Sequence, residues 1–211
     1  GDRSIEDFTQ LPFISSNSKL KPMIGIARTA KIRASVPTSL NVNEANDLRM
    51  KYYEYMYNKP DDQQIKNLCV IQDLDWPKII GSFWGEVNVS IHKGLGLAGT
   101  ITNGLLRDLD AIDKEYMVLA NSIGPSHAYV HVIEFRTDVE INGLNIKDGD
   151  IIHADKHGAL KVPYEALKTL PEAIEFMQKK ESHIIQAAKK DDFNIKKLRV
   201  AWARANSEKF E

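Results

Sequence analysis

The chain has 211 residues, of which 43% are hydrophobic, and its 28 basic and 29 acidic residues give a formal net charge of -1. This length can bury a sizeable core without disulfides, and the near-neutral balance gives no case for the clustered basic face that nucleic-acid binding needs. The single cysteine, Cys69, lies in an apolar run, cannot form an internal disulfide and suits a reducing compartment. No run approaches the roughly 18 apolar residues of a membrane span, and no signal peptide is visible. We therefore expect a cytoplasmic protein without membrane or nucleic-acid partners.

The first half of the chain mixes predicted strands and helices. Residues 1–22 are polar and irregular, and the alternating residues 23–32 predict a strand. Asn41, with Glu44 three residues later, has the capping-box pattern that starts a helix. Further along, the patterns predict a buried strand at 68–74, a loop at 75–81, a helix at 86–95, a strand at 99–102 and a helix at 105–116.

The second half adds hairpins and ends in helices. Asn142-Gly143 stands between two short apolar-alternating segments and predicts a two-residue β-hairpin, because the turn needs positive φ angles. Asp148-Gly149 predicts a second turn. The other predicted elements are strands at 117–121 and 127–135, a third chain reversal at 151–162, and helices at 164–190 and 194–207. We therefore expect one mixed α/β domain with a core at about residues 23–163, followed by C-terminal helices at about 164–207.

Candidate chemistry lies between residues 81 and 108. Gly85 precedes a predicted helix, whose first N–H groups lack partners within the helix and favour an anion such as a carboxylate; a plain turn is the alternative. Arg107 can hold a carboxylate or enolate oxygen, and Asp108 can hold Mg²⁺ through one carboxylate. A surface ion pair or a helix cap is the alternative for this pair. The glycine spacing fits neither a dinucleotide loop nor a phosphate loop.

Three other features invite a function. His127, Tyr129 and His131 would share one face of a strand, which suits either a metal site or a structural or interface role; we favour the structural or interface role because no further ligand is evident. Glu181 falls within an apolar helix stripe and needs a partner there, in an interface salt bridge or near a site. The last helix carries Ile195, Leu198, Trp202 and Ala205 on one face, which predicts a docking helix.

Several motifs occur together along the chain: Gly-Ile-Ala-Arg-Thr-Ala at 25–30, Gly-Glu-Val at 85–87, Gly-Leu-Gly-Leu-Ala-Gly-Thr-Ile-Thr-Asn-Gly-Leu-Leu-Arg-Asp at 94–108, the hairpin segment 139–155 and Val162-Pro163. Over about residues 23–190 the chain resembles the RraA-like family, which includes class II 4-hydroxy-4-methyl-2-oxoglutarate aldolases and the RNase E regulator RraA. The aldolases carry an acidic residue, twenty intervening residues and Arg-Asp. Glu86, Arg107 and Asp108 have that spacing, with glutamate where the family has aspartate.

The resemblance implies the swivelling β/β/α fold of phosphohistidine domains, assembled as a homotrimer or hexamer with sites between subunits. It implies Mg²⁺ or Mn²⁺ on Asp108, and a 2-oxo acid whose carboxylate binds backbone N–H groups of Gly85, Glu86, Val87 and Asn88. Arg107 would face the enolate and bind substrate, and Glu86 would move a proton through a metal-bound water. Glu181 would reach toward a neighbouring subunit's site.

Two functions follow as hypotheses. The first is a metal-dependent lyase on 2-oxo acids, which would cleave by retro-aldol reaction to pyruvate or decarboxylate oxaloacetate through a metal-stabilised enolate. The second is a non-catalytic regulatory protein that resembles the RNase E inhibitor. The retained Glu86, Arg107 and Asp108 favour the lyase.

Overall fold

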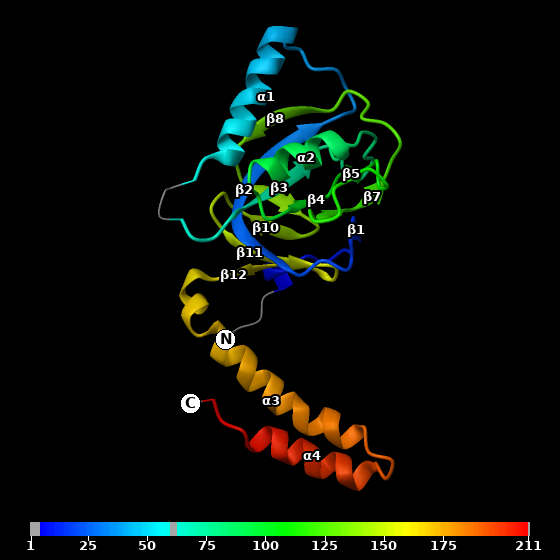
Figure 1. The fold of residues 1–211 in the computed structure, drawn as a ribbon, viewed down its shortest axis with the longest axis vertical. Coiled ribbons are helices and arrows are strands. Elements are labelled where there is room, and N and C mark those ends of the chain that lie inside the picture. The colour runs from blue at the N-terminus through cyan, green and yellow to red at the C-terminus, as the bar shows by residue number, and fades with distance from the viewer. Residues whose placement is uncertain (1–4, 60–62, 211) are drawn as a thin grey trace. The chain divides into compact units, whose positions relative to one another are not determined.

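The computed structural model describes residues 5–59 and 63–210 (Figure 1). The chain divides into two compact units, of which the first ends at Val162 and the second begins at Pro163. Among the described residues, no helix combines the length and the apolar character that crossing a membrane requires.

The main sheet of the first unit mixes parallel and antiparallel pairs, as predicted. Within the described residues it has eight strands in the order β1-β6-β4-β3-β2-β11-β12, with β8 also paired to β2. The central pairs β2–β3, β3–β4 and β4–β6 are parallel, and the outer pairs are antiparallel. The strands are β1 (Ile14–Ser15), β2 (Met23–Arg33), β3 (Asn67–Asp73), β4 (Thr100–Thr102), β6 (Val118–Ala120), β8 (His131–Phe135), β11 (Ile151–Asp155) and β12 (Gly158–Val162).

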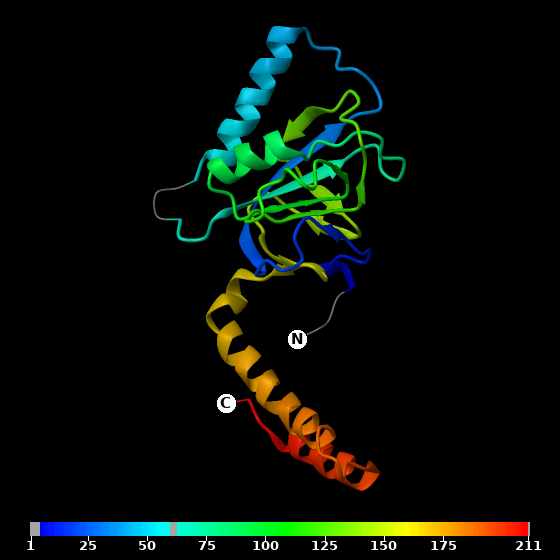
Figure 2. The same ribbon diagram turned by 45° about the vertical axis from the view of Figure 1, so that its right-hand side comes forward.

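Two core clusters of buried side chains pack against this sheet, which Figures 1 and 2 draw as a ribbon with its covering helices. Successive side chains of a strand point to opposite faces, and in β3 the side chains of Cys69 and Ile71 pack with buried residues of the helices α1 and α2. Leu68 and Val70 pack with buried residues of the hairpin β9–β10. These covering elements are α1 (Val42–Tyr57), α2 (Glu86–Gly94), β9 (Val139–Ile141) and β10 (Leu144–Ile146).

The local signals at α1 and at the hairpin are confirmed. Asn41 caps α1, its side chain accepts from the Glu44 N–H at 3.0 Å, and the Glu44 carboxylate accepts from the Asn41 N–H at 2.9 Å. Asn142 and Gly143 have φ angles of 53° and 87° and join antiparallel β9 and β10. Capping and turn chemistry fixed these elements locally.

The predicted helix at 105–116 is wrong. Leu105–Leu106 forms the strand β5, which pairs in parallel with β7 (Ser122–Ile123), and turns follow. Both leucines are buried, and Asp108 has a φ of 59°, which an α-helix does not allow. The helical spacing of apolar residues was overridden by burial in the sheet layer.

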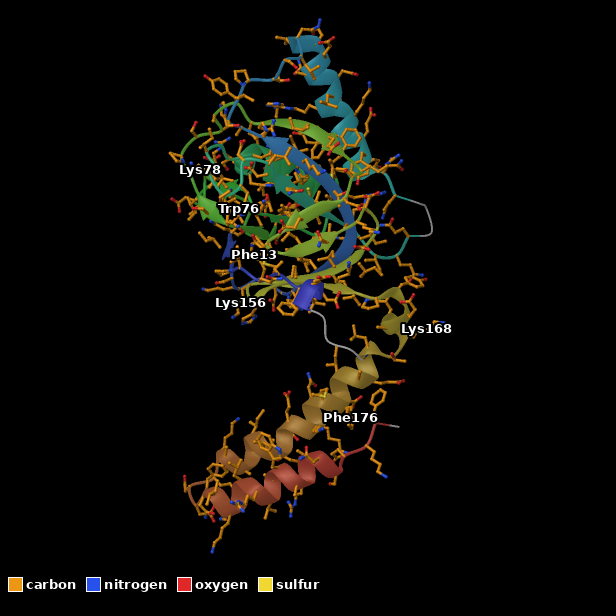
Figure 3. The ribbon with its side chains drawn as sticks, turned by 180° about the vertical axis from the view of Figure 1, so that it is seen from behind. Phe13, Trp76, Lys78, Lys156, Lys168 and Phe176 are labelled. Atoms are coloured by element: carbon orange, nitrogen blue, oxygen red, sulfur yellow. The ribbon has the colours of Figure 1, made fainter. Side chains whose placement is uncertain are left out.

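The predicted strand at 127–135 is correct only from His131 onward. Ala128 has a φ of 45°, and the Val130 N–H donates to the His127 carbonyl at 3.0 Å, so the chain turns before β8 begins. His127, Tyr129 and His131 therefore do not share one strand face. Earlier along the chain, the loop after β3, in which Trp76 and Lys78 are labelled in Figure 3, lies where a loop was predicted.

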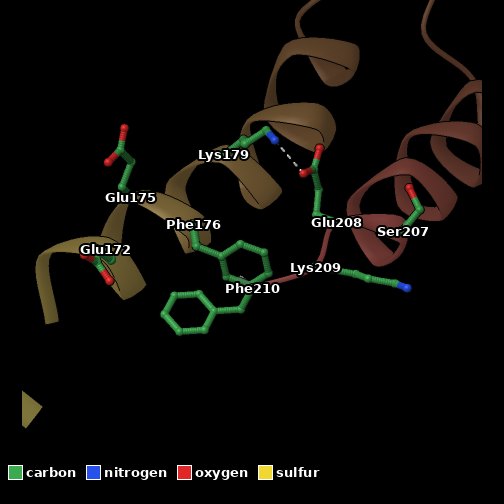
Figure 4. A pocket seen from close by; sticks show the side chains of 8 residues that line it. All are labelled: Glu172, Glu175, Phe176, Lys179, Ser207, Glu208, Lys209 and Phe210. Carbon is green, nitrogen blue, oxygen red and sulfur yellow. Dashed lines mark ion pairs between the residues drawn. The ribbon is translucent and has the colours of Figure 1, made fainter. Parts of the chain in front are cut away.

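The second unit is a pair of helices preceded by a 3-10 turn. Its elements are η2 (Tyr164–Lys168), α3 (Leu170–Ala188) and α4 (Ile195–Ser207), close to the predicted helices. The first unit contains another short 3-10 helix, η1 (Ile5–Asp7). Phe176 of α3 meets Phe210 edge-on with ring centroids 5.3 Å apart, and Lys179 pairs with Glu208 at 2.7 Å (Figure 4).

The predicted apolar stripe of α3, formed by Leu170, Ile174, Met177, Ile184 and Ala188, is not its packed face. Ile174 and Met177 are 48% and 45% exposed, and Glu181 is exposed beside them. The face that packs is rotated by about one residue and includes half-buried Phe176 and His183, the latter bonded to Glu208 at 2.8 Å. A helix with apolar residues on several faces does not reveal by spacing alone which face packs.

The predicted docking face of α4 is also divided. Ala205 is buried and Leu198 is half-buried, but Ile195 and Trp202 are 64% and 54% exposed.

Candidate functional site

The candidate site begins at the N-terminus of α2. Gly85 is its N-cap, in an extended conformation that any residue could adopt (φ -160°), so backbone strain does not require the glycine. Space requires it instead. A Cβ at position 85 would overlap Asp108 Oδ2 and lie 3.1 Å from both Cγ and Cζ of Arg107. The absent side chain lets the helix end approach these two residues closely.

Backbone contacts hold Arg107 and Asp108 against this helix end. The Arg107 N–H donates to the Trp84 carbonyl at 2.9 Å, and Trp84 forms a parallel bridge with Leu106. Asp108 takes a left-handed backbone conformation, which aspartate tolerates better than most residues. Its carbonyl accepts from the N–H groups of Ala111 and Ile112, each at 2.9 Å, so the turn after the strand is fixed.

Asp108 Oδ2 is the atom where the predicted residues meet. It accepts from Arg107 Nη1 at 2.8 Å and from the Glu86 backbone N–H at 3.2 Å. The side chains of Arg107 and Asp108 are 28% and 32% exposed, so a ligand can reach both. The structure therefore brings together Gly85, the backbone of Glu86, Arg107 and Asp108, and it engages the Glu86 N–H, which was predicted to bind the substrate carboxylate, with Asp108.

Polar groups remain available around this contact. Within the described residues, the N–H groups of Val87 and Asn88 have no acceptor, as expected for the first turn of a helix, and the next N–H, that of Val89, donates to the Gly85 carbonyl. Arg107 Nε is buried and also lacks a partner among the described residues. These donors, together with the dipole of α2, favour a bound anion.

The orientation of the Glu86 carboxylate is not fixed by neighbouring groups that the structure describes. The residue is exposed, and its side chain forms no hydrogen bond or ion pair within the described part of the chain. Only its backbone N–H touches Asp108. The structure thus places Glu86 at the site without orienting its carboxylate toward Arg107.

The donor set fits a hard divalent cation that keeps most of its water. Asp108 Oδ1 has no hydrogen-bond partner among the described residues, whereas Oδ2 is already engaged. The described residues contain no group of three His, Cys, Asp or Glu side chains able to hold a metal together. One carboxylate with waters and substrate oxygens is a usual environment for Mg²⁺, so Asp108 could hold such an ion.

Sequence analysis missed a polar layer behind α2. Tyr53 Oη donates to Asn88 Oδ1 at 2.7 Å, and Tyr52 Oη lies 2.7 Å from His92 Nε2. Burial lowers the pKa of His92 to about 4, so the ring is neutral at pH 7. Adjacent tyrosines in a predicted helix are a weak sequence signal for such a layer.

A buried carboxyl, Asp73, was also missed. It ends β3, and burial raises the pKa of its carboxyl to about 6. Its backbone N–H donates to Asn103 Oδ1 at 2.6 Å, its Oδ1 accepts from the Asp75 N–H at 2.9 Å, and its Oδ2 has no partner in the described chain. Asn103 begins the turn that leads to Arg107, so Asp73 supports the segment that carries the site.

The other predicted residues lie apart from these contacts. His127 Nδ1 and His131 Nδ1 bond to neighbouring backbone carbonyls at 2.7 and 2.8 Å, which agrees with a structural role. Glu181 belongs to the second unit, is exposed, and is not among the residues that line the pocket in Figure 4.

Comparison with known proteins gives both sequence and fold relatives. A family model described as RraA-like, Aldolase/RraA, matches residues 7–160. Protein DlpA of Legionella pneumophila is 30% identical over 90 residues, which are 40% of this chain and 14% of DlpA. The chain thus spans a small part of that relative.

Two solved structures share the fold. One is described as novel cellulases from microbes associated with the gut ecosystem. It is 21% identical with a TM-score of 0.67, and the match covers 85% of this chain and 76% of the other chain. The other is Streptomyces coelicolor RraAS2, described as an unusual member of the RNase ES inhibitor RraA protein family. It is 19% identical with a TM-score of 0.61, and the match covers 83% of this chain and 82% of the RraAS2 chain. The likeness confirms the expected mixed α/β fold with C-terminal helices.

Proposed function

Because this chain belongs to the RraA-like family, which covers aldolases and RraA proteins, we propose that it is a divalent-metal-dependent lyase on 2-oxo acids. The reaction would be retro-aldol cleavage that releases pyruvate, decarboxylation of oxaloacetate, or both. One observation carries the proposal: Asp108 Oδ2 joins the Arg107 guanidinium to the N-terminus of α2, where N–H groups remain open.

The chain's own groups suit the carboxylate and the neighbouring ketone of a 2-oxo acid. The open N–H groups of Val87 and Asn88 would bind the carboxylate, helped by the positive end of the helix dipole. Arg107 would donate to the adjacent ketone oxygen. As the carbon–carbon bond breaks, negative charge collects on that oxygen, and a fixed guanidinium beside it lowers the barrier.

Asp108 and Glu86 complete the proposed site. Asp108 would hold Mg²⁺ or Mn²⁺ through Oδ1, and the ion, when bound, would supply Lewis-acid stabilisation of the developing charge. In the retro-aldol direction Glu86 would take the proton from the substrate hydroxyl as the carbon–carbon bond breaks, and would return it to the enolate carbon that becomes the methyl group of pyruvate. Its exposed carboxylate is free to rotate toward a bound substrate, which suits this role better than a fixed ion pair would.

We also propose a homotrimer or hexamer, in which a neighbouring subunit closes the site and supplies Glu181. The partial exposure of Arg107 and Asp108 on the single chain, 28% and 32%, leaves room for such a neighbour. The buried free thiol of Cys69 is consistent with a reducing, cytoplasmic setting.

The test is pyruvate release from oxaloacetate and from 4-hydroxy-4-methyl-2-oxoglutarate, with Mg²⁺ and with EDTA. Arg107→Lys and Asp108→Asn should each lower kcat/KM by about 100-fold or more, because each removes a group that acts on the developing charge. Asp110→Asn is the matched control, since Asp110 is an exposed carboxylate two residues away. Absence of metal-dependent turnover of either substrate would contradict the proposal.

A second candidate is a regulatory protein that acts by surface contact. It is favoured by the fold shared with RraAS2, which is described as a member of an RNase inhibitor family. Binding to an RNase E-type enzyme that persists in Arg107→Ala and Asp108→Ala, together with no lyase activity in the unaltered chain, would select this function.

A further inference from the structure

We propose that Tyr53 of α1 is a positioning residue for the anion-binding end of α2, acting through the side chain of Asn88. The inference rests on the proposed function, since it assigns the task of holding the substrate's carboxylate to the first turn of α2. Tyr53 touches neither Arg107 nor Asp108, so its effect would pass through Asn88.

The amide of Asn88 ties three segments together. Its Nδ2 donates to the Phe83 carbonyl at 2.6 Å, and its Oδ1 accepts from Tyr53 Oη at 2.7 Å. A carbonyl oxygen can only accept, so Nδ2 must face Phe83 and Oδ1 must face Tyr53. The Phe83 carbonyl thus sets the orientation of the amide, and the hydroxyl of Tyr53 donates to its Oδ1 as a second anchor. Through Asn88, α1 holds both the first turn of α2 and the segment that precedes Gly85.

A second contact from α1 reaches the backbone of the same residue. His92 Nδ1 lies 2.6 Å from the Asn88 carbonyl, which can only accept, so Nδ1 carries the proton. In the neutral ring Nε2 then accepts, and Tyr52 Oη donates to it at 2.7 Å. Tyr52 and His92 are both fully buried. Adjacent tyrosines of α1 thus hold the side chain and the carbonyl of Asn88, one directly and one through His92.

Apart from the Glu86 N–H, which donates to Asp108 Oδ2, the bonds that hold Arg107 and Asp108 do not involve the first turn of α2. The Arg107 N–H donates to Trp84, and the Asp108 carbonyl accepts from the turn that follows it. Loss of the Tyr53 hydroxyl should therefore loosen the first turn of α2 while Arg107 and Asp108 stay in place. The substrate's carboxylate would bind less well, but the groups that act on the breaking bond would be unchanged.

The experiment compares Tyr53→Phe with Tyr57→Phe in the full chain. Tyr57 ends the same helix, is 64% exposed and forms no hydrogen bond through its hydroxyl within the described residues, so it is the matched control. The first readout is amide hydrogen exchange of Val89, whose N–H closes the first turn onto Gly85 at 3.0 Å, with the Arg107 N–H as internal reference. We expect about tenfold faster exchange at Val89 only, in keeping with one lost hydrogen bond.

The second readout is the steady-state kinetics of oxaloacetate turnover with Mg²⁺. Tyr53→Phe should raise KM about tenfold and leave kcat within about threefold, whereas Tyr57→Phe should change neither. A merely structural defect would lower the active fraction, and so kcat, without raising KM. Asn88→Asp gives a second arm, because a carboxylate cannot donate to Phe83, and it should act in the same direction.

The outcomes separate the two proposals. Unchanged Val89 exchange in Tyr53→Phe overturns the positioning role, whatever the activity. Unchanged KM in an active Tyr53→Phe variant overturns it as well. If Val89 exchange rises but the unaltered chain turns over no 2-oxo acid, the positioning of α2 by Tyr53 stands and the lyase proposal fails.

Discussion

The region around α2 and the helical pair α3–α4 use similar residues in opposite ways. Around α2, the aromatic side chains of Tyr52, Phe83 and Trp84 are buried and pack on the neutral ring of His92. In the helical pair, Trp202 and Ile195 face solvent, and the buried residues of α4 are Ala201 and Ala205.

The difference shows where geometry can be precise. Around α2 a dense apolar layer fixes a few polar atoms to within hydrogen-bond distance, so that Asp108, Arg107 and the helix end meet at one oxygen. In the helical pair the described contacts are sparser: two buried alanines of α4, the ring contact of Phe176 with Phe210, and partly exposed ion pairs such as Lys179 with Glu208, which contribute little to stability. Catalytic precision is therefore expected from the first unit.

The largest expected effect compares two tryptophans. Trp84 is fully buried, and Trp84→Ala should lower the free energy of unfolding by about 3–5 kcal/mol through a cavity next to His92. Trp202 is 54% exposed, and Trp202→Ala should cost under about 1 kcal/mol in the isolated chain. Urea denaturation at equal protein concentration measures both. Similar losses for the two variants would mean that the helical pair is buried in solution.

The next effect compares two glycines at the ends of α2. A Cβ on Gly85 would overlap Asp108 Oδ2, whereas a Cβ on Gly94 meets no atom within 4 Å. Gly85→Ala should therefore lower kcat/KM about 100-fold by displacing the Asp108 carboxylate. Gly94→Ala should keep full activity and gain up to about 1 kcal/mol of stability, because alanine is the better helix former. Lyase activity retained in Gly85→Ala would show that the close approach at Asp108 is dispensable.

Local signals made much of the fold predictable. The capping box at Asn41 and the Asn142-Gly143 turn are set by residues within a few positions of each other, and both are as predicted. The segment after Leu105 was not predictable in this way. Its apolar residues follow helical spacing, but Leu105 and Leu106 form a strand because they pair with residues 122–123, which are distant in sequence.

The contacts that support the candidate site were not predictable from the sequence. The resemblance to the RraA-like family pointed to Glu86, Arg107 and Asp108, and the structure joins the last two to the backbone of the first, while their roles stay predictions. Nothing in the spacing indicated that Tyr53 and His92 would bond to Asn88, because those contacts depend on how α1 lies across α2. The role of Glu181 and the binding of a metal ion by Asp108 stay predictions.

A smaller effect concerns the pH dependence of stability at Asp73. Burial raises the pKa of Asp73 to about 6 from its ordinary 3.8, so the folded state favours the protonated carboxyl. The stabilisation of the folded state by the protonated Asp73 carboxyl is therefore fully present below about pH 4 and is lost as the pH rises through about 6. Asp73→Asn cannot ionise and should exceed the unaltered chain in stability at pH 8, by on the order of 1–2 kcal/mol, but not at pH 4.

His92 does not confuse this comparison. Burial lowers the pKa of His92 to about 4 from 6.5, so its contribution has the opposite sign and is lost as the pH falls from about 6.5 to 4. The unaltered chain and Asp73→Asn both carry His92, so its effect cancels when their urea midpoints are subtracted at each pH. An equal difference at pH 4 and pH 8 would refute the role assigned to Asp73.

The smallest effect compares two helix caps of the same chemistry. Asn41 caps α1 and Asn194 caps α4, each through its side-chain oxygen onto two backbone N–H groups. Replacing either residue by alanine should lower the stability of its helix by about 1 kcal/mol, and this loss reaches the whole unit where the helix is packed into the core. α1 buries Tyr52, Tyr55 and Met56 in the core, so Asn41→Ala should lower the stability of the whole first unit by that amount.

α4 buries only two alanines, so the loss in Asn194→Ala should remain local. Amide exchange of Leu198, whose N–H donates to the Asn194 carbonyl at 2.9 Å, should rise about fivefold, while exchange in β3 stays unchanged. In Asn41→Ala, exchange in β3 should rise, because its slowest amides open only when the unit unfolds. Faster exchange of β3 in Asn194→Ala would show that the two units unfold together, and the contrast between a precise core and an independent helical pair would then be wrong.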